Sequence, residues 1–204
     1  DHVATVGGAV VVGNSSAAYR SEDDGHTWKE VLPRPVLDLF EDPLDPQTLY
    51  ALAIESAGIG PYAVLRSDDA GLHWTPVRTG DVDTLAVDPH EPGTLYSAED
   101  GGDRTILYKS SDRGGHWQET GTIPGFPART ISLVVDTKDP DVLWASDGGG
   151  VRRSEDGGRT WDWFNPGLAR IRLTSAVRLI PDPAVPGRLY ALPTGGGIFE
   201  ITTP

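Results

Sequence analysis

The chain has 204 residues, 38% of them hydrophobic, with 25 Gly, 17 Pro and neither Cys nor Met. The lack of Cys excludes disulfides, zinc–thiolate sites and a Cys nucleophile. The formal net charge of −13 opposes docking on a phosphate backbone, so we expect no nucleic-acid partner. The longest apolar stretch, residues 9–12, is far shorter than the roughly 20 residues of a membrane-spanning helix, and no membrane span is expected.

Position 1 is Asp, and the chain contains no Met at any position. This favours a processed mature chain or an excised domain, and a removed secretory signal is one route to it. We therefore expect an extracytoplasmic protein, either secreted or periplasmic.

Short β-type runs follow one order along the chain. A first run, at 36–40, 84–87, 131–135 and 176–180, precedes an Asp-Pro-rich turn. Leu-Tyr or Leu-Trp then begins a second run, at 49–50, 95–96, 143–144 and 189–190. A third run, at 17–20, 63–66, 106–109 and 150–153, ends in a basic residue. Because Gly, Pro and Asp clusters bound these runs, they are predicted strands, named A, B and C here.

An eight-residue segment, called the box here, follows strand C and leads into a fourth strand, D. It reads Ser, x, Asp, x, Gly, two further residues and Trp, and it occurs four times, with its aspartates separated by 46, 43 and 44 residues. Four antiparallel strands repeated at this spacing predict the blades of a β-propeller. The box residues are Ser21, Asp23, Gly25 and Trp28; Ser67, Asp69, Gly71 and Trp74; Ser110, Asp112, Gly114 and Trp117; and Ser154, Asp156, Gly158 and Trp161.

The two ends of the sequence together supply a fifth blade. Residues 175–204 provide strands A, B and C, and the apolar run at 2–6 is free to pair beside 198–201, which would complete the last blade and close the ring. The sequence thus predicts an all-β fold, a five-bladed propeller in a single domain over residues 1–204. Two alternatives stay open: an open segment of a larger ring, and copies that assemble into one.

The boxes resemble Asp-boxes, also called bacterial neuraminidase repeats. The order of Asp-Pro turn, Leu-Tyr, Gly-rich connection and box is similar to blades of sortilin-type propellers, of photosystem II assembly-factor propellers and of xyloglucan-cleaving glycoside hydrolases. The resemblance covers nearly the whole chain and implies that the box is structural. Its Asp would accept hydrogen bonds from its own turn, its Gly would adopt positive φ, and its Trp would pack between strands.

Ligand-binding residues are expected at the end of each blade opposite the box, because the B–C loops and D–A connections there are free to vary. The leading hypothesis is a non-catalytic binding or assembly module that recognises a protein or a glycan. The candidate acids are Glu55, Glu99, Asp100, Asp103 and Asp147. The candidate bases are Arg34, Arg129, Arg170 and Arg172, and the candidate stacking residues are Tyr62, Phe126 and Trp163.

Three further functions were weighed. A sialidase needs an Arg triad, a Tyr-Glu pair and an Arg-Ile-Pro segment; the last is missing and no Tyr-Glu pair can be placed. A glycoside hydrolase with two carboxylates roughly 5 to 9.5 Å apart stays open as an alternative, as does a structural subunit of a homo-oligomer or extracellular fibre. No cofactor is expected, although Glu99, Asp100 and Asp103 make one acidic turn a candidate for Ca²⁺ without the spacing of an EF-hand loop.

Overall fold

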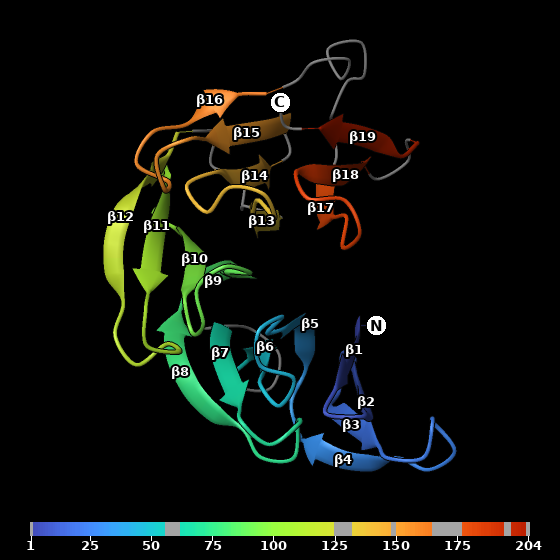
Figure 1. Cartoon of the computed structure of the whole chain (residues 1–204). Coiled ribbons are helices and arrows are strands. Elements are labelled where there is room, and N and C mark those ends of the chain that lie inside the picture. The colour runs from blue at the N-terminus through green and yellow to red at the C-terminus, as the bar shows by residue number, and fades with distance from the viewer. Residues whose placement is uncertain are drawn as a thin grey trace. The chain divides into compact units, whose positions relative to one another are not determined.

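The computed structural model describes residues 2–55, 62–124, 132–147, 150–164, 177–193 and 197–202. Within these ranges all of the regular elements are strands, and they form five antiparallel sheets (Figure 1). The sheets are the blades of a β-propeller, the fold class that the repeat predicted. No helix in the described ranges has the length and apolar character needed to cross a membrane.

Strand order within each sheet follows the chain. Blade 1 contains β1 (His2–Val6), β2 (Ala9–Gly13), β3 (Ala18–Ser21) and β4 (Lys29–Leu32). Blade 2 contains β5 (Val36–Glu41), β6 (Leu49–Ile54), β7 (Tyr62–Ser67) and β8 (Thr75–Gly80). Blade 3 contains β9 (Val82–Val87), β10 (Leu95–Asp100), β11 (Thr105–Ser110) and β12 (Gln118–Ile123). Blade 4 contains β13 (Ser132–Val135), β14 (Leu143–Asp147), β15 (Gly150–Ser154) and β16 (Asp162–Trp163), and blade 5 contains β17 (Val177–Pro181), β18 (Arg188–Pro193) and β19 (Phe199–Thr202).

The chain divides into two compact units. The first comprises Asp1–Val82, Glu91–Thr94 and Ser110–His116, and the second comprises Asp83–His90, Leu95–Lys109 and Trp117–Pro204. The single domain over residues 1–204 therefore stays a prediction, and each unit is described by itself.

The N-terminal strand does not pair as the sequence suggested. β1 pairs antiparallel with β2, from His2 opposite Gly13 to Val6 opposite Ala9. The turn residues Gly7 and Gly8 have φ of 55° and 80°, the positive values that a two-residue hairpin turn of type I′ requires. The expectation that residues 2–6 complete the last blade beside 198–201 was wrong, because this hairpin makes β1 the A strand of blade 1.

The hydrophobic cores lie between neighbouring blades of the same unit. One cluster joins residues of blades 1 and 2, a second joins blades 3 and 4, and a third joins blades 4 and 5. In blade 2, β6 is covered on both faces and is buried from Leu49 to Ala53, whereas β4 of blade 1 begins with exposed residues. In blades 1 and 5 every second residue of the B strands β2 and β18 is buried. The continuous apolar sequence of β6 fits its burial on both faces.

The Asp-Pro turn between strands A and B is held by its first carboxylate. Asp42, Asp88, Asp136 and Asp182 each accept the backbone N–H of the residue two positions later at 2.8 to 2.9 Å. In blades 4 and 5 the other carboxylate oxygen accepts a hydrogen bond at 3.0 Å from the strand-B aromatic residue, Trp144 or Tyr190. In blade 2 the Tyr50 hydroxyl and Asp42 Oδ2 are both buried, and neither has a hydrogen-bond partner in the described part of the chain.

Candidate functional site

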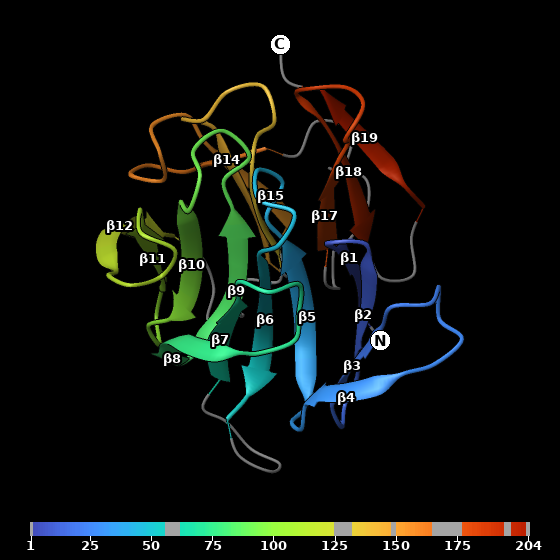
Figure 2. The same cartoon turned by 60° about the horizontal axis from the view of Figure 1, so that its bottom comes forward.

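Each antiparallel blade has two ends, which differ in their sequence variation. The box end carries the A–B turn and the box, and the loop end carries the B–C loop and the D–A connection (Figure 2). The box end has the same turn in four blades. The B–C loops at 14–17, 55–61, 101–104, 148–149 and 194–198 differ in length and sequence.

The four boxes share one hydrogen-bond pattern. The Ser hydroxyl donates to the Asp carboxylate at 2.8 to 2.9 Å and accepts the backbone N–H of the box Gly at 2.9 Å. The same carboxylate accepts the backbone N–H of the residue four positions later at 2.8 to 2.9 Å. That residue also donates from its side chain at 2.6 Å, through the hydroxyl of Thr27 or Thr160 or through Nδ1 of His73 or His116. Both carboxylate oxygens are therefore engaged within the turn.

These hydrogen bonds stabilise the ionised form of the box carboxylates. The Thr27 hydroxyl and backbone lower the pKa of Asp23 to about 2, and Thr160 does the same for the pKa of Asp156, also to about 2. Burial opposes the shift most strongly at Asp69, but donation from His73 still lowers its pKa to about 2. A general acid needs a raised pKa, so these carboxylates are suited to accept hydrogen bonds and not to protonate a leaving group at neutral pH.

The box of one blade lies against the preceding blade in the same unit. A Cβ placed on Gly71 of blade 2 would meet Val11 Cγ2 of blade 1 at 2.8 Å, and a Cβ placed on Gly158 of blade 4 would meet Leu107 Cδ2 of blade 3 at 2.2 Å. Arg20 Nε of blade 1 donates to the Ala70 carbonyl of the next box at 2.6 Å. The box is thus one of the contacts between two neighbouring blades.

The box tryptophans do not all pack in the same way. The indole Nε1 donates to the carbonyl of its own box Gly at 3.0 Å in Trp28 and Trp161 and at 3.2 Å in Trp74. Trp161 is buried in the core between blades 3 and 4, and Trp74 packs against the core between blades 1 and 2. Trp28 is 43% exposed.

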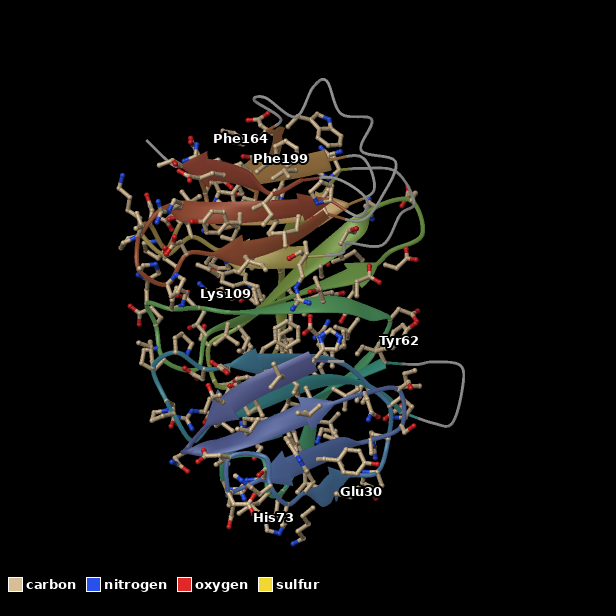
Figure 3. The ribbon with its side chains drawn as sticks, turned by 90° about the vertical axis from the view of Figure 1, so that its right-hand side faces the viewer. Glu30, Tyr62, His73, Lys109, Phe164 and Phe199 are labelled. Carbon is tan, nitrogen blue, oxygen red and sulfur yellow. The ribbon has the colours of Figure 1, made fainter. Side chains whose placement is uncertain are left out.

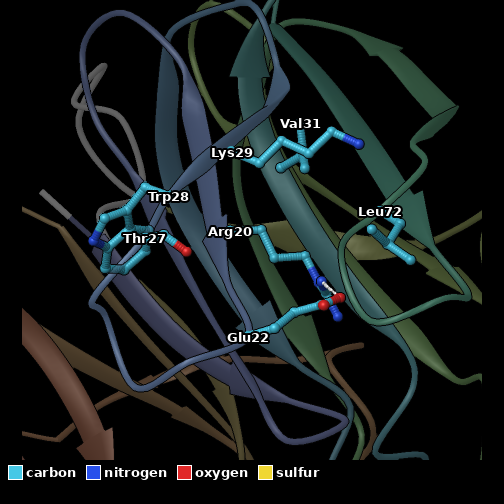
Figure 4. A pocket seen from close by; sticks show the side chains of 7 residues that line it. All are labelled: Arg20, Glu22, Thr27, Trp28, Lys29, Val31 and Leu72. Atoms are coloured by element: carbon cyan, nitrogen blue, oxygen red, sulfur yellow. Dashed lines mark hydrogen bonds and ion pairs between the residues drawn. The ribbon is translucent and has the colours of Figure 1, made fainter.

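A pocket of about 270 Å³ lies near Trp28 (Figure 4). The ion pair of Arg20 and Glu22 lies in its wall, and Leu72 reaches it from the box of blade 2. Its lining residues are Arg20, Glu22, Thr27, Trp28, Lys29, Val31 and Leu72. None of the residues that the sequence proposed for ligand binding lines this pocket.

The loop-end candidates are dispersed. Arg34 is half-buried between β4 and β5, and Tyr62 is half-buried at the start of β7, where it pairs with Ile54 (Figure 3). Glu99 and Asp100 end β10, and Asp103 is exposed in the loop that follows. Four candidates lie outside the described residues: Phe126, Arg129, Arg170 and Arg172. The same holds for residues 56–61, which follow Glu55, and for the side chain of Asp147.

The acidic turn after β10 uses part of its carboxylate set for its own backbone. Asp100 Oδ1 accepts the backbone N–H of Gly102 at 2.7 Å, which commits one carboxylate oxygen to the turn itself. Across the described ranges, no group of three or more His, Asp or Glu side chains is placed to hold a metal ion. The Ca²⁺ hypothesis therefore gains no support from this turn.

Trp163 is the candidate with the most defined surroundings. It lies in β16 directly opposite Arg152 of β15, and the Arg152 guanidinium carbon lies 3.6 Å from the indole ring centroid. Arg152 is only 6% exposed, whereas Trp163 is 47% exposed. The guanidinium therefore covers one face of the indole and holds the ring in place while the rest of it meets solvent. The sequence analysis named Trp163 and missed Arg152, whose signal is its position two residues before the box Ser, where the other blades carry Tyr19, Leu65 and Tyr108.

No protein-family model and no curated protein matches the chain. Among solved structures, the chain is similar to a GH74 enzyme of Niastella koreensis, with a TM-score of 0.74, 20% identity and coverage of 99% of this chain and 35% of that one. It is similar to the extracellular domain of a putative one-component system of B. thetaiotaomicron, with a TM-score of 0.70, 11% identity and coverage of 98% and 26%. It is also similar to YCF48 bound to D1 peptide, with a TM-score of 0.50, 16% identity and coverage of 100% and 78%. The chain thus spans about a third of the GH74 enzyme's length, and these likenesses show the β-propeller fold.

Proposed function

We propose that the chain is a non-catalytic β-propeller of the Asp-box type that binds a glycan on strands C and D of blade 4, outside the cytoplasm. The observation that carries this proposal is the pair of Trp163 and Arg152. An exposed indole gives a flat apolar surface on which a sugar ring stacks. Since the buried guanidinium already fixes the ring, little side-chain entropy is lost when a ligand binds.

The distribution of sequence variation supports a ligand site outside the boxes. The repeated box ties up its Ser and Asp in hydrogen bonds that are the same from blade to blade, which fits the structural role that we propose for it. Loops at the opposite end differ between blades, and variable loops on a constant scaffold are where ligand contacts concentrate. The extracellular domain among the similar structures favours the same compartment.

Two alternatives have specific support. The GH74 likeness favours a glycoside hydrolase, which needs one carboxylic acid of raised pKa near a second carboxylate. Against it, the carboxyl groups whose pKa departs from the ordinary value in the described ranges, such as Asp45 and Asp182, are all shifted downward. The likeness to YCF48, which is bound to a peptide, favours a protein partner instead.

Affinity electrophoresis against soluble polysaccharides, including xyloglucan and mixed-linkage β-glucan, tests the proposal. We expect retardation by at least one polysaccharide, and we expect Trp163→Ala to lower the affinity at least about tenfold, equivalent to about 1.4 kcal/mol. Trp28→Ala is the matched control, because Trp28 is similarly exposed but lies at a box end. Unchanged binding by Trp163→Ala, or no binding to any polysaccharide, would overturn the glycan proposal, and release of reducing ends would establish the hydrolase alternative.

A further inference from the structure

The first two blades form the pocket that Figure 4 shows. It has a volume of about 270 Å³, and all of the residues that line it lie between positions 20 and 72. They therefore belong to the first unit, within Asp1–Val82, and to blades 1 and 2. Strands C and D of blade 1 supply most of the lining, and Leu72 reaches the pocket from the box of blade 2. The pocket is thus defined within one unit.

Blade 1 places two bases opposite each other in this lining. In each of blades 1 to 4, the base directly before the box Ser pairs with the first residue of strand D. That partner is Thr75 in blade 2, Gln118 in blade 3 and Asp162 in blade 4, which are neutral or acidic. In blade 1 the partner is Lys29, opposite Arg20. Because like charges at directly paired positions destabilise a strand pair, blade 1 carries a repulsion that the other three lack.

The charge of these two bases is only partly balanced. Arg20 donates from Nε to the Ala70 carbonyl at 2.6 Å and from Nη1 to Glu22, and its Nη2 has no hydrogen-bond partner within the described ranges. The side chain of Arg20 is only 9% exposed, whereas that of Glu22 is 71% exposed. Lys29 is exposed and forms no ion pair with another described residue. A single carboxylate, largely in solvent, thus faces two cationic side chains.

The same pocket has an apolar part. Val31 packs against the core between blades 1 and 2 and is half-buried, as is Leu72. Both line the pocket, so part of each aliphatic side chain faces it. Figure 4 shows the side chains of Arg20 and Lys29 extending toward the side on which Leu72 lies. Cationic groups and an apolar surface are therefore within reach of one small ligand.

We propose that this pocket binds a small organic carboxylate with an apolar body. The ligand's carboxylate accepts hydrogen bonds from Arg20 Nη2 and Lys29 Nζ, which offsets the repulsion between the two bases. Its hydrocarbon lies against Val31 and Leu72. One negative charge fits this pocket better than a phosphate dianion, because Glu22 is part of the lining and the chain has a formal net charge of −13.

A ligand-observed NMR titration with hexanoate tests this site, with hexanamide, acetate and inorganic phosphate as comparisons. We expect hexanoate to bind in a saturable way and about tenfold more tightly than hexanamide, which lacks the charge. Acetate should bind at least about tenfold more weakly than hexanoate, because it has no hydrocarbon body to bury. Phosphate should also bind more weakly, since it has neither the apolar body nor the single charge.

Two variants locate the binding in this pocket. Lys29→Gln should lower the affinity for hexanoate about threefold, and Glu22→Gln should raise it by a similar factor. Lys138→Gln is the matched control, since it removes an exposed Lys charge from the A–B turn of blade 4 and should leave the affinity unchanged. Lys29→Gln also removes one of two opposed bases, so its urea midpoint without ligand should not fall. Weaker binding by this variant then reflects the lost charge and not a lost fold.

Three results would overturn the proposal. One is the absence of saturable hexanoate binding at millimolar concentration. A second is an affinity for hexanamide, acetate or phosphate equal to that for hexanoate. The third is an equal loss of affinity in Lys29→Gln and Lys138→Gln. Xyloglucan and mixed-linkage β-glucan carry no carboxylate, and Trp163 lies in blade 4, so the polysaccharide assay and this titration succeed or fail separately.

Discussion

Substituting Gly158 with Ala tests whether the box is the contact between blades. Gly158 has a φ of 88°, which an L-residue adopts at a cost of about 1–2 kcal/mol. Its new Cβ would also lie 2.2 Å from Leu107 Cδ2, far inside van der Waals contact. Leu107 is completely buried, so it has little room to move, and such overpacking costs about 1–3 kcal/mol. We expect Gly158→Ala to lower the free energy of unfolding by about 2–5 kcal/mol.

The neighbouring Gly157 provides the matched control. Its φ is 70°, but a Cβ there would meet no atom within 4 Å. The corresponding positions of the other boxes hold Asp24, Ala70 and Arg113 at φ of 54° to 60°, so the fold accepts a side chain at this place. Gly157→Ala should therefore cost no more than about 1–2 kcal/mol, the conformational part alone.

Urea unfolding followed by tryptophan fluorescence measures both variants, and two further variants extend the series. A Cβ on Gly71 would lie 2.8 Å from Val11, and one on Gly25 would meet only its own Trp28 at 3.4 Å, so the losses should decrease from Gly158 to Gly71 to Gly25. Leu107→Ala should make Gly158→Ala less costly, because the overlapping methyl group is gone. Equal losses for Gly158→Ala and Gly157→Ala would refute the reasoning.

Two smaller effects follow from hydrogen bonds. Because Thr160 lowers the folded-state pKa of Asp156 to about 2 from 3.8, this carboxylate stabilises the fold above about pH 4 and loses its effect as the pH falls toward 2. Asp156→Asn should thus be less stable than the unmodified chain at pH 6, and urea titrations should show the difference shrinking between pH 4 and pH 2. Tyr190→Phe should lower the denaturation midpoint by removing a donor to Asp182. Tyr50→Phe should not, since the Tyr50 hydroxyl has no partner among the described residues; the opposite order would contradict the assignment of these bonds.

The blades were predictable because their signals are local. The Ser, Asp and Gly of each box form hydrogen bonds with one another across only a few residues. The local sequence is therefore enough to predict the turn. The regular spacing of that turn predicted the blades as repeats, whereas the prediction of five came from joining the two ends of the sequence in a pairing that was wrong. The N-terminal hairpin was also local, and Gly7 and Gly8 between two apolar runs were the signal that the sequence analysis passed over.

The candidate site was predicted only in part. Trp163 could be named as an exposed aromatic residue, but its pairing with Arg152 depends on the register between β15 and β16. Trp28 and Trp161 occupy the same position of the same motif, yet one is 43% exposed and the other 7%. No pattern within a box separates them, because Trp161 is buried by side chains of blade 3 that lie far from the box in the sequence.

The sequence by itself determined the box turns, the order of strands A to D and the all-β fold, since these depend on backbone preferences and hydrogen bonds between residues close in the chain. Only the tertiary structure decided which box tryptophan stays exposed and which side chains of the preceding blade lie against a box Gly. Each of these features depends on side chains of another blade, about 40 residues away or more in the chain, that pack against the residue. Identical motifs therefore have different surroundings, and the surroundings decide which of them are open to a partner.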